Sequence, residues 1–235
     1  MNLIPDAELL RTPQNVLMAD PRTLHLAARD TIANKLKSVD IEIQHSNIVQ
    51  FVLNETVPAD IIIHFETAKN CYLYAWFVFR FYQVAEQQAY ATLELALRER
   101  FPEFVQKIVQ KSKLNVPPSL SSLLKHAQHK NVLRNELFNN RDTWARSRAE
   151  ERHLHQIHLL MMESNLSEVT CDYSGVQVSE EDLNCDWLST FIEHMPDLRN
   201  DLAHGSARLH HTVLHTFDVV QSMINMLYPN VDGVH

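Results

Sequence analysis

Apolar residues recur every three or four positions along most of the chain, which is the period of an amphipathic helix. Residues 21–36 follow this pattern. Asp20-Pro21 is typical of a helix start, with the aspartate as N-cap and the proline in the first turn. A second short helix is expected over residues 46–54. The pattern therefore predicts a helical appendage at the N-terminus, over residues 1–58.

The longest periodic segment covers residues 58–100. It predicts one long helix, which Phe101-Pro102 ends or kinks because proline disfavours helical geometry in the residue before it. An apolar stripe for burial follows its second half: Val78, Phe81, Ala85, Ala89, Leu93 and Leu97. Its first half holds more aromatic side chains than one buried face needs. We expect that half to be buried on every side, against the N-terminal residues or a second subunit.

Shorter periodic segments fill the rest of the chain. Helices are expected over residues 103–113, 120–127, 146–162, 181–194 and 206–227, with Ser119 as the cap of the second. The helix over 146–162 is expected to bury Leu154, Ile157, Leu160 and Met161. Residues 164–181 are polar and are expected to form a loop. The whole pattern predicts an all-α fold.

The composition supports a helical fold and excludes several classes of protein. Only three of the 235 residues are glycine, which excludes dinucleotide folds, phosphate-binding loops and hairpin-rich sandwiches. The three cysteines are widely spaced, which favours free thiols in a reducing compartment. We recognise neither a signal peptide nor an apolar run of bilayer length, so we expect a cytoplasmic protein without membrane attachment.

Charge is distributed unevenly along the chain. The net charge is −8, yet residues 98–152 contain 12 basic and 6 acidic residues, a net charge of +6. The overall acidity argues against a general nucleic-acid coat protein, whereas the basic segment would present a local positive surface. An ordinary solvated surface would account for the same imbalance.

The densest group of reactive side chains lies in residues 198–205, Leu-Arg-Asn-Asp-Leu-Ala-His-Gly. On an unbroken helix, Arg199 and His204 would lie about 140° apart. A chain break at Gly205, with Ser206 capping the next helix, would let His204 turn toward Arg199 beside free backbone N–H groups. Such a group suits phosphoryl transfer. An ordinary helix corner would instead pair Arg199 with a neighbouring aspartate, Asp197 or Asp201.

This stretch resembles the Arg-x4-His signature of HEPN domains. The matching residues are Arg199-Asn200-x-x-Ala203-His204-Gly205, before a C-terminal helix that ends at Tyr228-Pro229. Upstream, Tyr82-x3-Glu86-x3-Tyr90-x2-Leu93-Glu94 resembles the long first helix of that family, and residues 120–127 its second. The resemblance covers about residues 60–230. It implies an up-and-down helical bundle over residues 59–235, with an insertion at about 134–182, that forms a homodimer.

The resemblance also implies an activity, because catalytic HEPN domains are metal-independent endoribonucleases. His204 would act as general base or acid when the RNA 2′-OH attacks the adjacent phosphate. Arg199 would stabilise the charge of the phosphorane, and Asn200 would orient the phosphate. The products would be a 2′,3′-cyclic phosphate and a 5′-OH. Such proteins commonly serve as toxins or in defence against phage, which implies an antitoxin or regulatory protein as a further partner.

The RNA would be held by basic and imidazole side chains outside the reacting group. Single-stranded regions are the expected target, since their bases are accessible. The candidate RNA-binding residues are Arg146, Arg148, Arg152, Arg208 and His211.

Two alternatives remain open. A non-catalytic HEPN-like module would bind RNA, a nucleotide or a protein without turnover. A metal-dependent enzyme would use clustered histidines: His210-His211-x3-His215, His126-x2-His129 or His153-x-His155-x2-His158. No Glu or Cys completes a ligand set at an obvious spacing, so no metal and no other cofactor is expected.

Overall fold

The structure is a computed structural model of the chain, and it describes residues 4–30, 35–112, 114–204 and 209–230. Its α-helices are α1 (Ile41–Val49), α2 (Ala59–Tyr74), α3 (Phe81–Arg100), α4 (Pro102–Lys111), α5 (Leu120–His129), α6 (Arg141–Glu163), α7 (Glu180–Leu183), α8 (Trp187–Ala203) and α9 (Leu214–Leu227). Short 3-10 helices cover η1 (Asp6–Glu8), η2 (Thr23–His25) and η3 (Asn135–Leu137). An antiparallel hairpin pairs β1 (Ala27–Asp30) with β2 (Lys35–Ser38). The predicted all-α class is confirmed.

The helix predicted over residues 21–36 is wrong, because η2 and the hairpin stand in its place. Asp20 caps no α-helix. Its buried carboxylate accepts hydrogen bonds from the backbone N–H groups of Arg22 and Phe79, at 3.0 and 3.1 Å. The next helix begins five residues earlier than predicted, at Ile41, where the Asp40 side chain accepts a hydrogen bond from the N–H of Ile43 at 2.8 Å.

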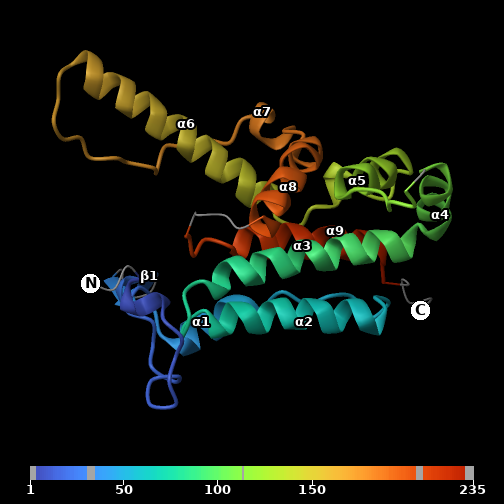
Figure 1. Cartoon of the computed structure of the whole chain (residues 1–235). Coiled ribbons are helices and arrows are strands. Elements are labelled where there is room, and N and C mark those ends of the chain that lie inside the picture. The colour runs from blue at the N-terminus through green and yellow to red at the C-terminus, as the bar shows by residue number, and fades with distance from the viewer. Residues whose placement is uncertain (1–3, 31–34, 113, 205–208, 231–235) are drawn as a thin grey trace, which may run out of the picture.

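The segment over 58–100 is two antiparallel helices, not one (Figure 1). A turn over residues 75–80 separates α2 from α3. The N-terminal residues hold this turn, because Asp20 accepts the N–H of Phe79 and donates its own N–H to the carbonyl of Trp76 at 2.9 Å. A sequence window over 58–100 does not contain the partner that stabilises the break.

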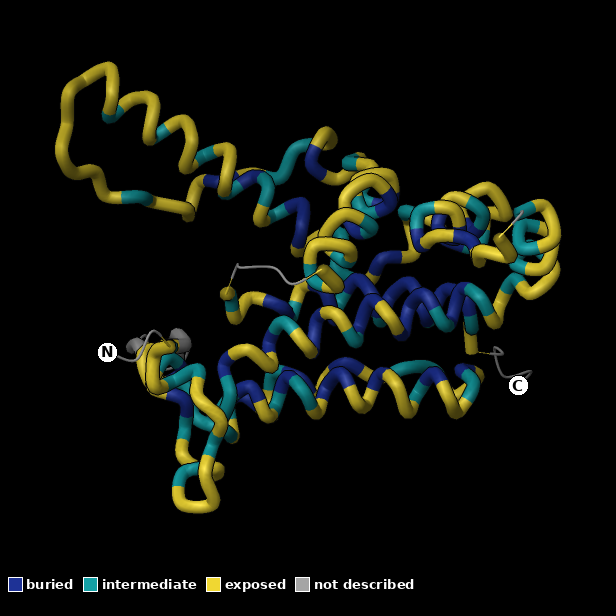
Figure 2. Tube along the Cα trace, in the orientation of Figure 1, coloured by how far each residue is buried: buried dark blue, intermediate teal, exposed yellow. Residues whose placement is uncertain are grey.

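Helix α3 lies at the centre of the molecule, against α2, α5, α8 and α9 (Figure 1). Buried residues gather along α3 and α9, as Figure 2 shows. Four positions of the predicted stripe are completely buried: Ala85, Ala89, Leu93 and Leu97. The aromatic segment is less uniformly covered than expected. Tyr72, Phe79 and Tyr82 are buried, whereas Tyr74 and Phe81 are exposed in the single chain.

Residues before α2 belong to the same core as the helices that follow. Ile48, Phe51 and Val57 lie in one buried cluster with α3 and α9. The side chain of Asn225 in α9 accepts the N–H of Asn54 at 2.8 Å.

Helices α4 and α5 match their predictions closely, and Ser119 caps α5 by accepting the N–H of Ser122 at 3.3 Å. Helix α6 is longer than predicted and projects away from the bundle, with the loop after it running back alongside (Figure 1). The predicted buried side of α6 is wrong for Leu154 and Leu160, which are exposed. Its buried residues, Trp144, Ala145 and Ala149, lie in the half that contacts the bundle (Figure 2).

The last two helices differ from prediction in their bounds. Helix α8 continues through Pro196 to Ala203, and α9 begins at Leu214 instead of Ser206. The described residues between them, 209–213, are not helical. Within the part of the chain that the structure describes, no helix is both long and apolar enough to cross a bilayer.

Candidate functional site

Arg199, Asn200 and His204 lie at the C-terminal end of α8. Arg199 and Asn200 occupy its last turns, and His204 is the C-cap, with its backbone N–H donating to the carbonyl of Asn200 at 2.9 Å. The helix therefore stays intact up to His204. Gly205 and Ser206, the expected break and cap, lie outside the described residues, and so does Arg208.

Arg199 is oriented by a carboxylate of α3. Its Nη2 donates to Oε2 of Glu94 at 3.1 Å, and its Nη1 donates to the side-chain oxygen of Asn200 at 3.4 Å. Glu94 is buried and also bonds Arg98 through its other oxygen. The partner of Arg199 is thus an acid 105 residues upstream, neither Asp197 nor Asp201. About a third of the Arg199 side chain stays exposed.

His204 is exposed, and no hydrogen bond joins it to Arg199 in the described part of the chain. An unbroken helix up to Ala203 keeps the two side chains on different faces, as the 100° step requires. The N-terminus of α9 lies ten positions beyond His204, so the predicted helix start beside His204 is wrong. One copy of the chain brings Arg199 and Asn200 together but does not bring His204 to them.

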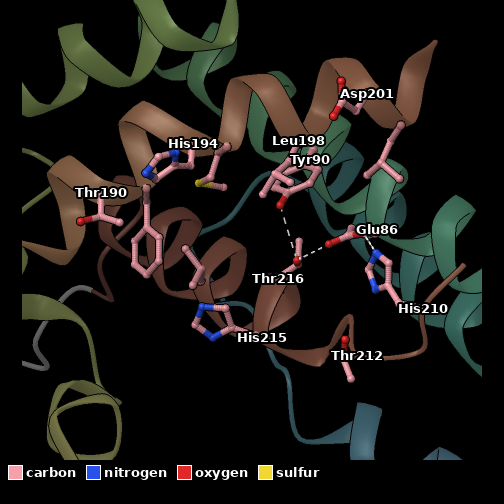
Figure 3. A pocket seen from close by; sticks show the side chains of 14 residues that line it. Glu86, Tyr90, Thr190, His194, Leu198, Asp201, His210, Thr212, His215 and Thr216 are labelled. Carbon is pink, nitrogen blue, oxygen red and sulfur yellow. Dashed lines mark hydrogen bonds and ion pairs between the residues drawn. The ribbon is translucent and has the colours of Figure 1, made fainter. Parts of the chain in front are cut away.

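A cavity of about 490 Å³ lies beside this helix end, between α3, α8 and α9 (Figure 3). Leu198, Asp201 and Leu202, from the same turns of α8 as Arg199, form one of its walls. Glu86 and Tyr90 of α3 form the opposite side. The cavity therefore adjoins the residues that the sequence singled out.

A hydrogen-bonded group lines the cavity (Figure 3). Oε1 of Glu86 accepts a hydrogen bond from the hydroxyl of Thr216 at 2.6 Å, and the hydroxyls of Thr216 and Tyr90 are 3.5 Å apart. Oε2 of Glu86 lies 3.4 Å from Nε2 of His210, an ion pair when the imidazole is protonated. Glu86 is buried, with 6% of its surface exposed. A buried carboxylate with a histidine and two hydroxyls can accept protons or bind a donor.

Burial shifts the acidity of other groups around the cavity. It raises the pKa of Tyr90 to about 12, so the phenol stays protonated at neutral pH. It lowers the pKa of His215, so this imidazole is neutral there. The rings of Trp144 and Phe191 contact His215, at 5.6 and 5.9 Å between centroids.

Three candidate RNA-binding arginines have partners within the chain. Arg146 donates to Glu150 and to the carbonyl of Val176, each at 2.7 Å. Arg152 binds both carboxylate oxygens of Asp182, and Arg148 lies 3.7 Å from the same carboxylate. These arginines fasten residues 173–182 to α6.

The histidines of the sequence clusters are dispersed among several environments. His211 packs its ring against Tyr82, 6.4 Å between centroids, and lines a different cavity from His210. His126 stacks on Phe104 at 3.9 Å, and burial lowers its pKa. His153 contacts the carbonyl of Asp172 at 3.0 Å. Among the described residues, no group of three or more His, Cys, Asp or Glu side chains is placed to hold a metal ion.

Glu86, Tyr90 and Thr216 were not among the predicted site residues. The signal for Glu86 and Tyr90 is the spacing Glu86-x3-Tyr90-x3-Glu94, which places three polar side chains on one face of a helix, whereas nothing in the sequence connects Thr216 to them. The sequence does not predict that these side chains are buried, because the helices that cover this face, α8 and α9, are far away along the chain.

Comparisons with protein-family models, with curated proteins and with solved structures found no match to this chain.

Proposed function

We propose that the protein is a metal-independent endoribonuclease of the HEPN type, with its reacting groups at the C-terminal end of α8. One observation carries this proposal: a buried carboxylate, Glu94, orients Arg199 while about a third of the Arg199 side chain stays exposed, on the same helix end as His204. An arginine held in this way is preorganised for a phosphate, since it loses little side-chain freedom on binding.

In this mechanism His204 removes the proton of the RNA 2′-OH, or protonates the leaving 5′ oxygen. The 2′ oxygen attacks the adjacent phosphorus, and the bond from phosphorus to the 5′ oxygen breaks. Arg199 stabilises the added negative charge, and Asn200, which already contacts Arg199, orients the phosphate. The products are a 2′,3′-cyclic phosphate and a 5′-OH.

The site forms between two copies of the chain. Within one copy, His204 and Arg199 lie on different faces of α8, so a second copy is needed to bring a histidine opposite an arginine. We propose a cytoplasmic homodimer whose activity a further protein restrains, in a toxin or phage-defence role.

The contact between Arg199 and Glu94 also favours a second candidate function. A guanidinium already paired with a buried carboxylate can be purely structural, and the protein would then bind RNA, a nucleotide or a protein without turnover.

The test is cleavage of mixed RNA by the purified protein in excess EDTA, with product ends analysed for a 2′,3′-cyclic phosphate. We expect His204→Ala and Arg199→Ala each to reduce the rate at least about 100-fold. His129→Ala is the matched control, because His129 is also an exposed histidine at the end of a helix. RNA binding without cleavage would favour the second function. Equal cleavage by all variants would refute both the proposed location of the active site and the catalytic roles of Arg199 and His204.

A further inference from the structure

The cavity beside α8 has the size and the lining of a ligand site that the proposed chemistry at Arg199 and His204 does not use. Its volume of about 490 Å³ lies in the range of small-molecule pockets, roughly 300–1,000 Å³. Its walls come from α3, α8 and the residues around the start of α9 (Figure 3).

The polar side of the cavity offers hydrogen-bond acceptors. Glu86 accepts one bond from Thr216 and faces His210, yet each carboxylate oxygen can accept more than one hydrogen bond. A ligand with N–H groups could therefore bind Glu86 without displacing Thr216.

His210 carries an unmet hydrogen-bonding atom. Its Nδ1 is buried and has no partner in the part of the chain that the structure describes. A buried polar atom without a partner costs free energy, so nothing in the described chain fixes the orientation of this imidazole through Nδ1. This observation is independent of the carboxylate.

The remaining walls suit a flat, neutral ring. The rings of Phe191, His194 and His215 line the cavity together with Tyr90, and no lysine or arginine of the described chain does so. A phosphate would meet the carboxylates of Glu86 and Asp201, and no lysine or arginine among the described lining residues would offset their charge. These carboxylates disfavour the phosphate of a nucleotide, whereas a neutral base meets no such repulsion.

The cavity and the carboxylate that holds Arg199 lie along the same helix, α3. Glu86, Tyr90 and Glu94 follow one another on one face of α3, and Glu94 holds Arg199. The Cα atoms of Glu86 and Glu94 are separated by about 12 Å along the axis, at 1.5 Å per residue. A base and a nearby phosphate of the same strand can occupy the two positions.

We propose that this cavity receives an unstacked base of the RNA substrate, and that Glu86 selects bases with an exocyclic amino group over uracil. Adenine, cytosine and guanine present an N–H₂ donor to the carboxylate, whereas uracil places carbonyl oxygens on both sides of its single N–H. This inference rests on the proposed ribonuclease function, whose site lies at the same end of α8.

The first experiment measures binding without cleavage. Adenosine, cytidine and uridine are titrated into the intact His204→Ala protein by calorimetry. We expect adenosine and cytidine to bind more tightly than uridine. In the His204→Ala protein, the further substitution Glu86→Gln should weaken the binding of adenosine and of cytidine about tenfold, because an amide replaces one acceptor with a donor. The binding of uridine should not become weaker. Glu193→Gln, an exposed change on the same helix as Arg199, is the control.

A second variant keeps the test valid if Glu86→Gln does not fold, as judged by circular dichroism. Leu198→Trp fills the cavity from a position that is 46% exposed and leaves Glu86 in place. It should weaken all three nucleosides. Equal affinity for the three nucleosides, or affinities that neither variant changes, would overturn the base site.

The two proposals fail in different ways. If the protein cleaves RNA and Glu86→Gln does not change its preference among A, C and U, the ribonuclease proposal stands and the base site is refuted. If the protein binds nucleosides through Glu86 but cleaves no RNA, the ribonuclease proposal is refuted and the base-binding cavity stands.

Discussion

At the scale of the residue, Asp20 shows how one side chain replaces a predicted helix with a different structure. Its side chain has no exposed surface and accepts hydrogen bonds from the Arg22 backbone and guanidinium and from the Phe79 backbone. The guanidinium of Arg22 lies 5.0 Å from the centre of the Phe79 ring. Burial alone would raise the pKa of Asp20, but the hydrogen bonds from Arg22 and Phe79 outweigh it and lower the pKa.

We predict that Asp20→Asn lowers the free energy of unfolding by about 3 kcal/mol at pH 7, because it leaves Arg22 facing a neutral amide in a buried site. A group whose folded pKa is lowered stabilises the fold above its unfolded pKa, about 3.9, and loses that effect as the pH falls further. The difference between the two proteins should therefore shrink below about pH 4. Urea unfolding across this range measures it.

Asp6→Asn is the control, since Asp6 is exposed in the same N-terminal segment. A difference between wild type and Asp20→Asn that stays constant down to pH 3 would mean that the carboxylate's charge is not what stabilises the turn.

Some residues of the candidate site are adjacent in the sequence, whereas others are brought together only by the packing of distant helices. Arg199, Asn200 and His204 are visible in the sequence because they are adjacent, and the structure places them on one helix end. Glu86 has no such neighbours in sequence. Its partners Thr216 and His210 are more than 120 residues away, and only the packing of α9 on α3 brings them to it. Chemistry that depends on such contacts cannot be derived from spacing.

At the scale of the element, local sequence signals correctly predict the helices whose ends they determine. Ser119 and Pro102 act through the backbone beside them, and the helices they begin, α5 and α4, lie where expected. The break between α2 and α3 depends on Asp20, more than fifty residues away, and the prediction of a single helix there is wrong. The apolar spacing of α6 predicts a buried face, although no helix among the described residues lies beside its distal half (Figure 2).

Helix α6 is fastened at its base by Asp182. This aspartate has no exposed side-chain surface, binds Arg152 through both oxygens and forms a capping box with Ser179. The hydrogen bonds from Arg152 and from the Ser179 backbone hold the pKa of Asp182 far below its usual range. The contact therefore persists at neutral pH and closes the loop that follows α6.

We predict that Arg152→Gln loosens this loop without unfolding the bundle. Amide hydrogen exchange over residues 173–183 should become at least severalfold faster, while exchange in α3 and α9 is unchanged. Arg148→Gln is the matched control, because its contacts are longer, 3.4 and 3.7 Å, and it should have a smaller effect. Faster exchange in all helices would instead make the Asp182 contact part of the global core.

At the scale of the whole molecule, one buried ring connects segments that the sequence divides. The Phe217 ring of α9 lies 6.1 Å from Phe51, 5.8 Å from Phe65 and 6.1 Å from Tyr72, measured between centroids. Phe51 belongs to the segment predicted as an appendage, and the other two belong to α2. The same core therefore includes residues from both sides of position 58.

We predict that the described chain unfolds in a single transition, and that Phe217→Ala lowers its free energy of unfolding by about 4 kcal/mol. The fluorescence of Trp76 reports on the turn that Asp20 holds, and the fluorescence of Trp187 reports on the packing of α8. Variants that keep only one of these tryptophans therefore report on the two regions separately. Their denaturation midpoints should coincide in wild type and shift together with Phe217→Ala, whereas Leu10→Ala, at a site 94% exposed, should shift neither. An earlier midpoint for Trp76 would make residues 1–58 a separable unit. A common midpoint would mean that the position of Glu86 and Glu94 on α3, and so the geometry of the candidate site, depends on the whole chain.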